Sequence, residues 1–115
     1  MTTLNSNPAL TIIPSACYKI TEGELDLAGA CRQGSVIISR DELAELFGEP
    51  NYSTNDPEEK VTFEYYLQTP FGVANLYDYW WNAVNTVSIG AKDEAVSGYL
   101  VNLFEGLGYK TDKDN

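Results

Sequence analysis

The chain has no histidine and only two cysteines, Cys17 and Cys31, among its 115 residues. Histidine is the commonest general acid–base group and a leading metal ligand, so its absence excludes a Ser-His-Asp triad or a Cys-His pair within the chain. Two cysteines are too few for a disulfide scaffold or a cysteine zinc site. We therefore expect no cofactor, no metal and no enzymatic activity. An enzyme built on Asp78, Glu64 or a cysteine is the alternative.

Basic residues are also scarce. Seven Lys and Arg stand against 17 Asp and Glu, which gives a formal net charge of −10 at pH 7. This sign excludes a basic nucleic-acid-binding domain. No apolar run approaches the ~20 residues of a membrane span, and the first residues lack the pattern of a signal peptide. We expect a cytoplasmic protein with no membrane contact and two reduced thiols, since a Cys17–Cys31 bridge would require an oxidising compartment.

Length and composition predict one globular domain. The chain is 43% apolar and contains two Trp, eight Tyr and four Phe, so it has 14 aromatic residues. This composition is typical of a folded chain rather than a disordered one. Residues 1–16 contain two prolines and little periodicity, so we expect an irregular N-terminal arm there. The α+β domain should span residues 17–109, and residues 110–115 should form a polar tail.

Two capping boxes predict short helices in the first half of the chain. Thr21 with a Glu three residues later should begin a helix that ends before Gly34. A second box begins at Ser39, and its helix over residues 40–47 has an apolar stripe that is closed by glycine and proline. Between the two helices, the apolar run at residues 36–38 predicts a short buried strand.

A β-hairpin is the clearest predicted feature. Residues 60–68 alternate as a strand, a Pro-Phe turn follows, and residues 73–81 read as the returning strand. Residues 86–89 should add a third strand, and apolar residues at helical spacing predict a helix over residues 92–105. The sum is an α+β domain in which a three-stranded antiparallel sheet, at about 60–89, is packed by the C-terminal helix and one or two short N-terminal helices.

With the turn centred on residues 70–71, opposed residues of the hairpin have numbers that sum to 141. The face that carries Tyr65 and Leu67 is then apolar and should be the core side. Asp78 is the one charge on that side, and we expect it to accept a backbone N–H at the end of the sheet. The other face is amphipathic, and it is either packed by a helix or presents an aromatic surface to a partner. The candidate aromatic contacts are Tyr66, Tyr77, Tyr79 and Trp81, with Trp80 on the core side.

Acidic residues are concentrated in one part of the chain. Residues 22–59 hold ten acidic and two basic residues, a net charge of −8, whereas the other 77 residues hold seven and five, a net charge of −2. One interpretation is a carboxylate surface that resembles a phosphate backbone and attracts a basic protein. The other is a solvated face that provides solubility. The candidate acidic contacts are Asp41, Glu42, Glu45, Glu49, Asp56, Glu58 and Glu59.

In composition alone, the chain resembles small acidic proteins, often viral, that disarm host nucleases by mimicking DNA or covering its binding site. That resemblance implies a non-enzymatic inhibitor or regulator that acts in the host cytoplasm, with a basic surface of a nuclease or another nucleic-acid-binding enzyme as its partner. It implies no direct binding of nucleic acid by this chain. The alternative is a structural module that self-associates, for example as a homodimer, through the aromatic hairpin.

Overall fold

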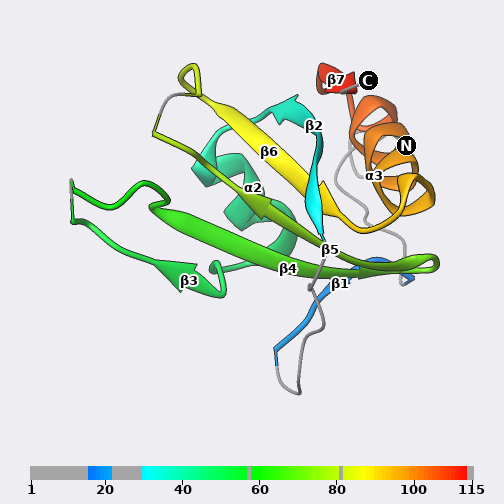
Figure 1. Cartoon of the computed structure of the whole chain (residues 1–115), viewed down its shortest axis with the longest axis horizontal. Helices are drawn as coiled ribbons and strands as arrows, with labels where there is room; N and C mark the ends of the chain where they lie inside the picture. The colour runs from blue at the N-terminus through cyan, green and yellow to red at the C-terminus, as the bar shows by residue number, and fades with distance from the viewer. Residues whose placement is uncertain (1–15, 22–29, 57, 81, 114–115) are drawn as a thin grey trace, which may run out of the picture.

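A seven-stranded antiparallel sheet and two helices form an α+β fold in the described part of the computed structural model (Figure 1). The structure describes residues 16–21, 30–56, 58–80 and 82–113. The elements in chain order are β1 Tyr18–Lys19, β2 Cys31–Ile37, α2 Arg40–Phe47, β3 Tyr52–Ser53, β4 Phe63–Thr69, β5 Gly72–Tyr77, β6 Thr86–Ala91, α3 Glu94–Gly106 and β7 Thr111–Lys113.

The sheet is larger than the predicted three strands. Its order is β1-β4-β5-β6-β2-β7, and β3 pairs with β4 beside β1. The three predicted strands are the central β4, β5 and β6. Strands β1, β3 and β7 have only two or three residues each, too few to show an alternating pattern in the sequence. The segment predicted as a polar tail contains β7, which pairs with β2.

The predicted first helix is wrong in its last residues. Residues 31–33 lie in strand β2, which pairs with β6 and has a bulge between Arg32 and Gly34. The rest of that predicted helix, residues 22–29, lies outside the described residues. Gly34 is needed where β7 approaches, because a Cβ there would lie 2.7 Å from the carbonyl oxygen of Asp112. The predicted short buried strand at 36–38 is confirmed in part, because Val36 and Ile37 end β2 and both Val36 and Ile38 are buried, whereas Ile37 is 52% exposed.

The predicted second helix is confirmed as α2, with its capping box. The Ser39 N–H donates to Glu42 Oε1 at 2.9 Å, and the Glu42 N–H donates to Ser39 Oγ at 3.1 Å. The helix ends at Gly48, as predicted. Leu43 is its fully buried residue.

The hairpin register is also confirmed. Tyr65 pairs with Leu76 and Glu64 pairs with Tyr77, which are partners whose numbers sum to 141. The returning strand is shorter than predicted, because β5 ends at Tyr77. Beyond it, the carboxylate of Asp78 accepts the N–H groups of two residues that precede or begin β4, as expected; they are Thr62 at 2.8 Å and Phe63 at 3.1 Å.

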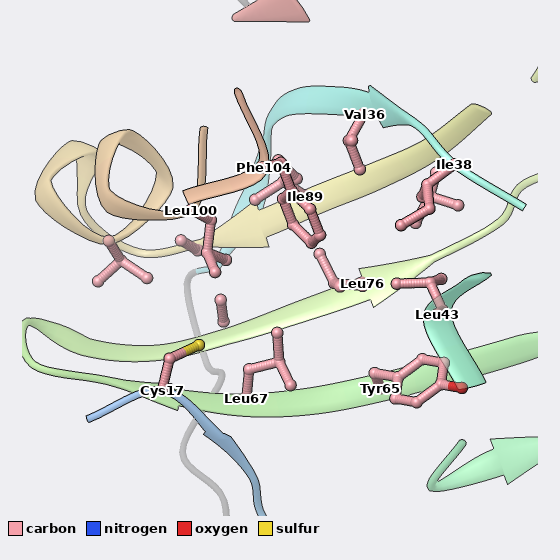
Figure 2. Close-up of a cluster of buried hydrophobic side chains, with 14 of the residues drawn as sticks. Cys17, Val36, Ile38, Leu43, Tyr65, Leu67, Leu76, Ile89, Leu100 and Phe104 are labelled. Atoms are coloured by element: carbon pink, nitrogen blue, oxygen red, sulfur yellow. The ribbon is translucent and has the colours of Figure 1, made fainter. Parts of the chain in front are cut away.

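Both helices pack on one face of the sheet, and the core lies between them and the strands (Figure 2). Leu43 of α2 and Leu100 and Phe104 of α3 join the core residues of the strands. Helix α3 begins at the N-cap Asp93, whose side chain accepts the N–H of Ala95. None of the helices in the described residues is long and apolar enough to cross a membrane.

The outer edge of β4 is covered along its length. Strand β3 pairs with its first residues and β1 with its last ones. Between them, the Asn51 side chain accepts the N–H of Tyr66 at 2.9 Å and donates to the carbonyl of Ile20 at 2.5 Å. One amide side chain thus supplies the backbone partners that a continuous strand would supply.

Candidate partner-binding groove

The second face of the sheet carries the polar residues of the hairpin, and neither α2 nor α3 lies on it. Along β4 the fully buried residues alternate with half-buried ones, and Glu64 and Tyr66 belong to the half-buried set. Asn75 and Tyr77 occupy the matching positions on β5. The predicted amphipathic face therefore exists, and the helices α2 and α3 cover the opposite one.

Glu64 lies at the centre of a hydrogen-bonded cluster on this face. Its Oε2 accepts from Asn75 Nδ2 at 2.7 Å, and its Oε1 accepts from the Tyr66 hydroxyl at 3.3 Å. Burial, followed by the neighbouring Glu64 charge, raises the pKa of Tyr66. Asn75 lies over Gly90 of β6, where a Cβ would come within 2.2 Å of Asn75 Oδ1. A glycine at this position thus allows the amide to hold Glu64 in place.

A surface hollow of about 470 Å³ opens beside Glu64, where the β3–β4 connection leads into the first residues of β4. We call this hollow the acidic groove. Three of its residues are carboxylates, two are tyrosines and one is aliphatic: Glu58, Glu59, Glu64, Tyr52, Tyr66 and Val61. Lys60 is its one basic lining residue. A smaller hollow of about 320 Å³ continues from Val61 and Glu64 towards Tyr77 and Gly90.

The acidic groove suits a cation that carries some apolar surface. Carboxylates attract ammonium and guanidinium groups, and the face of a tyrosine ring contributes a cation–π contact. Glu64 is already oriented by its bonds to Asn75 and Tyr66, so it loses little conformational freedom when it binds. The side chains of Lys and Arg combine a cationic head with an aliphatic stem, which makes them well matched to this groove.

The structure divides the predicted acidic contacts between the two sides of the sheet. Asp41, Glu42 and Glu45 belong to α2, on the helix side, whereas Glu58 and Glu59 line the groove on the other side. Asp41 and Glu45 are exposed. The sequence segment is continuous, but the surface that it forms is not.

Glu42 has a structural role in α2. The hydrogen bond from the Ser39 backbone has the largest effect and lowers the pKa of the Glu42 carboxyl group. Burial, the next largest effect, opposes it, and bonds from the Ser39 and Tyr109 hydroxyls lower the pKa further. The same contact acts on the phenol, because burial and then the Glu42 charge raise the pKa of Tyr109. Glu42 therefore ties α2 to the segment that follows α3.

The remaining acidic contacts lie between these two regions. Glu49 is exposed directly after α2, and its backbone carbonyl accepts from Lys19 Nζ at 2.5 Å. Asp56 shapes the turn that leads to the groove, because its Oδ1 accepts the N–H of Glu58 at 3.0 Å and its own N–H donates to Thr54 Oγ1 at 3.1 Å. The hydrogen bonds of Asp56 thus stabilise the loop that carries Glu58.

The predicted aromatic contacts have different positions. Tyr66 lines the acidic groove and Tyr77 lines the smaller hollow. Tyr79 lies beyond the end of β5, with its ring centroid 6.5 Å from that of Trp80. Trp81 lies outside the described residues. Trp80 is 63% exposed, so its predicted place on the core side is wrong, because the strand does not continue that far.

Sequence reasoning missed Tyr52, which is 42% exposed and lines the groove. Its position follows from the pairing of β3 with Glu64, and a two-residue strand leaves no pattern to detect. The only available signal was a tyrosine within an acidic, turn-rich segment. That signal does not distinguish a binding residue from a surface one.

Both cysteines are free thiols in the structure. Cys17 is buried and Cys31 is exposed. Burial raises the pKa of Cys17 to about 11, which keeps it protonated at neutral pH. Within the described residues, no three His, Cys, Asp or Glu side chains are grouped so that they could hold a metal ion.

Comparison with family models, curated proteins and solved structures finds no match to this chain.

Proposed function

We propose that this protein is a non-enzymatic binding protein that inhibits or regulates a nucleic-acid-binding enzyme by covering part of its basic surface. The observation that carries this proposal is the acidic groove, in which Glu58, Glu59 and Glu64 converge beside Tyr52 and Tyr66. A nucleic-acid-binding surface is rich in Lys and Arg, and those are the side chains that the groove suits.

The net charge of −10 supports the same proposal through long-range attraction. Opposite charges on two proteins accelerate their encounter, and the effect weakens as salt screens it. The division of the acidic contacts between two sides of the sheet favours occlusion by a local groove over imitation of an extended phosphate lattice. The tyrosines then provide the packed contacts that charge alone cannot provide.

A self-associating structural module is the second candidate function. It is favoured by an apolar hollow of about 470 Å³ on α3, beside the hairpin turn, where none of the described lining residues is Asp, Glu, Lys or Arg. Phe71 at the turn is 62% exposed, and its ring meets Tyr99 edge to face at 6.0 Å between centroids. An uncharged patch is where two copies with the same net charge repel each other least. This candidate predicts a dimer in sedimentation that the Phe71→Ser variant abolishes.

The primary test compares two double variants that remove the same charge from opposite sides of the sheet. Glu58→Gln with Glu59→Gln changes the groove, and Asp41→Asn with Glu45→Gln changes α2. An oligo-arginine peptide serves as the probe of basic character. We expect the groove variant to bind it about three- to tenfold more weakly than the wild type, with a smaller salt dependence, and the α2 variant to lose less.

Salt dependence is measured between ionic strengths at which the Debye length falls from about 30 Å to about 3 Å. Equal losses in both double variants would mean that net charge, and not the groove, attracts the peptide. Retention of binding at high salt by both would contradict the electrostatic part of the proposal.

A further inference from the structure

A second hollow, unrelated to the acidic groove, opens at the end of the core where the β5–β6 connection passes the first residue of α2. Its volume is about 300 Å³. The core residues Ile38, Phe63 and Val87 contribute buried side chains to it, each at most 5% exposed. Trp80 and Val84 are its exposed apolar residues, at 63% and 87%. The hollow therefore leads from an apolar rim to the hydrophobic core.

Hydrogen bonds hold residues 82–86 of the β5–β6 connection in place. Asn82 Nδ2 donates to the carbonyl of Thr86 at 3.2 Å and to the Ser88 hydroxyl at 3.1 Å. The Ile38 N–H donates to the carbonyl of Asn85 at 2.8 Å, and Asn85 adopts a φ of 59°, which asparagine tolerates better than most residues. The part of the wall formed by residues 82–85 is therefore held by hydrogen bonds, as is usual for a preformed ligand site.

One cationic group faces this hollow. The guanidinium carbon of Arg40 lies 5.5 Å from the centroid of the Phe63 ring. Although the chain has 17 carboxylates, Arg40 has no ion pair within 4.0 Å to any residue that the structure describes. Asp78 also lines the hollow, but its Oδ1 already accepts two backbone N–H groups and its Oδ2 accepts the Thr62 hydroxyl. Arg40 thus retains hydrogen-bond donors for a ligand.

We propose that this hollow binds a small organic carboxylate with a flat apolar body. Arg40 pairs with the carboxylate, because a guanidinium matches the two oxygens of that group. The apolar body lies against Phe63 and Val87, with Trp80 beside it at the rim. A volume of about 300 Å³ is at the lower end of ligand sites, which suits a ligand of one ring.

Two other ligand classes fit less well. A neutral apolar molecule would bury the Arg40 guanidinium without a counter-charge, which costs free energy. A phosphate would leave the apolar floor unused, and its second charge would be repelled by Asp78 and by the net charge of −10. A monoanion with a ring satisfies both the cation and the apolar floor.

The test uses phenylacetate as the probe and phenylacetamide as its neutral counterpart, with NMR titration of backbone amides. We expect saturable shifts at Ile38, Phe63 and Val87 with phenylacetate, and binding of phenylacetamide at least about tenfold weaker. The variant Arg40→Gln should weaken phenylacetate binding about tenfold or more. The matched control Arg32→Gln removes the same charge from β2 and should leave binding unchanged.

The variant Val84→Asp provides an independent check, because Val84 is 87% exposed and its replacement leaves the core intact. A carboxylate at the rim should repel phenylacetate and leave phenylacetamide unaffected. The proposal is overturned if the wild type shows no saturable shift at these amides, if both probes bind equally, or if Arg40→Gln binds phenylacetate like the wild type. None of these outcomes bears on the acidic groove, which lies on the other face of the sheet.

Discussion

The two faces of the β4–β5 hairpin differ in chemistry although they are built from alternate residues of the same strands. On the helix-covered face, Tyr65, Leu67 and Leu76 are fully buried and pack with α2 and α3. On the other face, Glu64 and Asn75, one position away, are half-buried and hydrogen-bonded to each other. The comparison teaches that alternate residues of one hairpin can build the hydrophobic core on one face and an ordered polar cluster on the other.

The largest effect should come from the covered face. Leu76→Ala removes a fully buried side chain, and we expect it to lower the free energy of unfolding by about 2–5 kcal/mol. Val73→Ala on the same strand truncates a half-buried residue of the opposite face and should cost less than half as much. Urea unfolding of both variants measures the difference. Similar losses would contradict the assignment of the core to one face.

The next largest effect concerns the hydrogen bond between Asn75 and Glu64 on the polar face of the hairpin. Gly90→Ala places a methyl group 2.2 Å from the present position of Asn75 Oδ1, so the Asn75 side chain must shift, and we expect its bond to Glu64 to be lost. We expect a loss of about 1–3 kcal/mol in thermal or urea unfolding.

The double variant Gly90→Ala with Asn75→Ala is the control for this prediction. Removing the Asn75 amide removes the obstacle to the new methyl group. The stability losses of the single variants Gly90→Ala and Asn75→Ala, added together, should therefore exceed the loss of the double variant. Additive losses would show that Gly90 is needed for another reason.

A smaller effect concerns α2, which closes the covered face. Ser39→Ala removes the side chain that accepts the Glu42 N–H, and we expect it to cost about 1 kcal/mol in urea unfolding. The capping box would be excluded as a source of stability if this variant unfolded like the wild type.

The pH dependence of the same helix follows from Glu42. Its pKa is lowered in the folded protein, so its contribution to stability is complete above the ordinary pKa of a glutamate and is lost as pH falls through the folded-state pKa. The difference in stability between the wild type and Glu42→Gln should therefore be largest near neutral pH and narrow in acid. A stability difference that grows in acid would mean that folding raises the pKa of Glu42 rather than lowering it.

The smallest effect is expected in the groove. Glu58→Gln with Glu59→Gln alters two exposed side chains, so the free energy of unfolding should change by less than about 0.5 kcal/mol in urea unfolding. Relief of repulsion within a chain of net charge −10 can make the change slightly favourable. A loss as large as that of Ser39→Ala would mean that these carboxylates serve folding rather than binding.

The sequence predicted the parts of the fold that have strong local patterns. The capping box of α2, the hairpin register and the pairing of Asp78 with backbone N–H groups all follow from residues close in the sequence or opposed across one turn. The short strands could not be predicted, because β1, β3 and β7 exist through pairing with distant strands rather than through their own composition.

The site was predicted only in part for the same reason. Tyr66, Glu58 and Glu59 were identified by type and charge, but their meeting in one groove depends on β3 lying beside β4. The separation of Asp41 and Glu45 from them depends on which face α2 covers. Counting charge along the chain cannot show on which side of a sheet each charge lies.

The most direct test of the proposed function is an NMR titration of the wild-type protein with an oligo-arginine peptide at low salt. We expect the largest backbone amide shifts at Tyr52, Glu64 and Tyr66, around the acidic groove, and small shifts along α2. Shifts that are concentrated at Asp41 and Glu45, or spread evenly over both faces, would contradict the proposal that the face of the sheet opposite α2 and α3 is the binding surface.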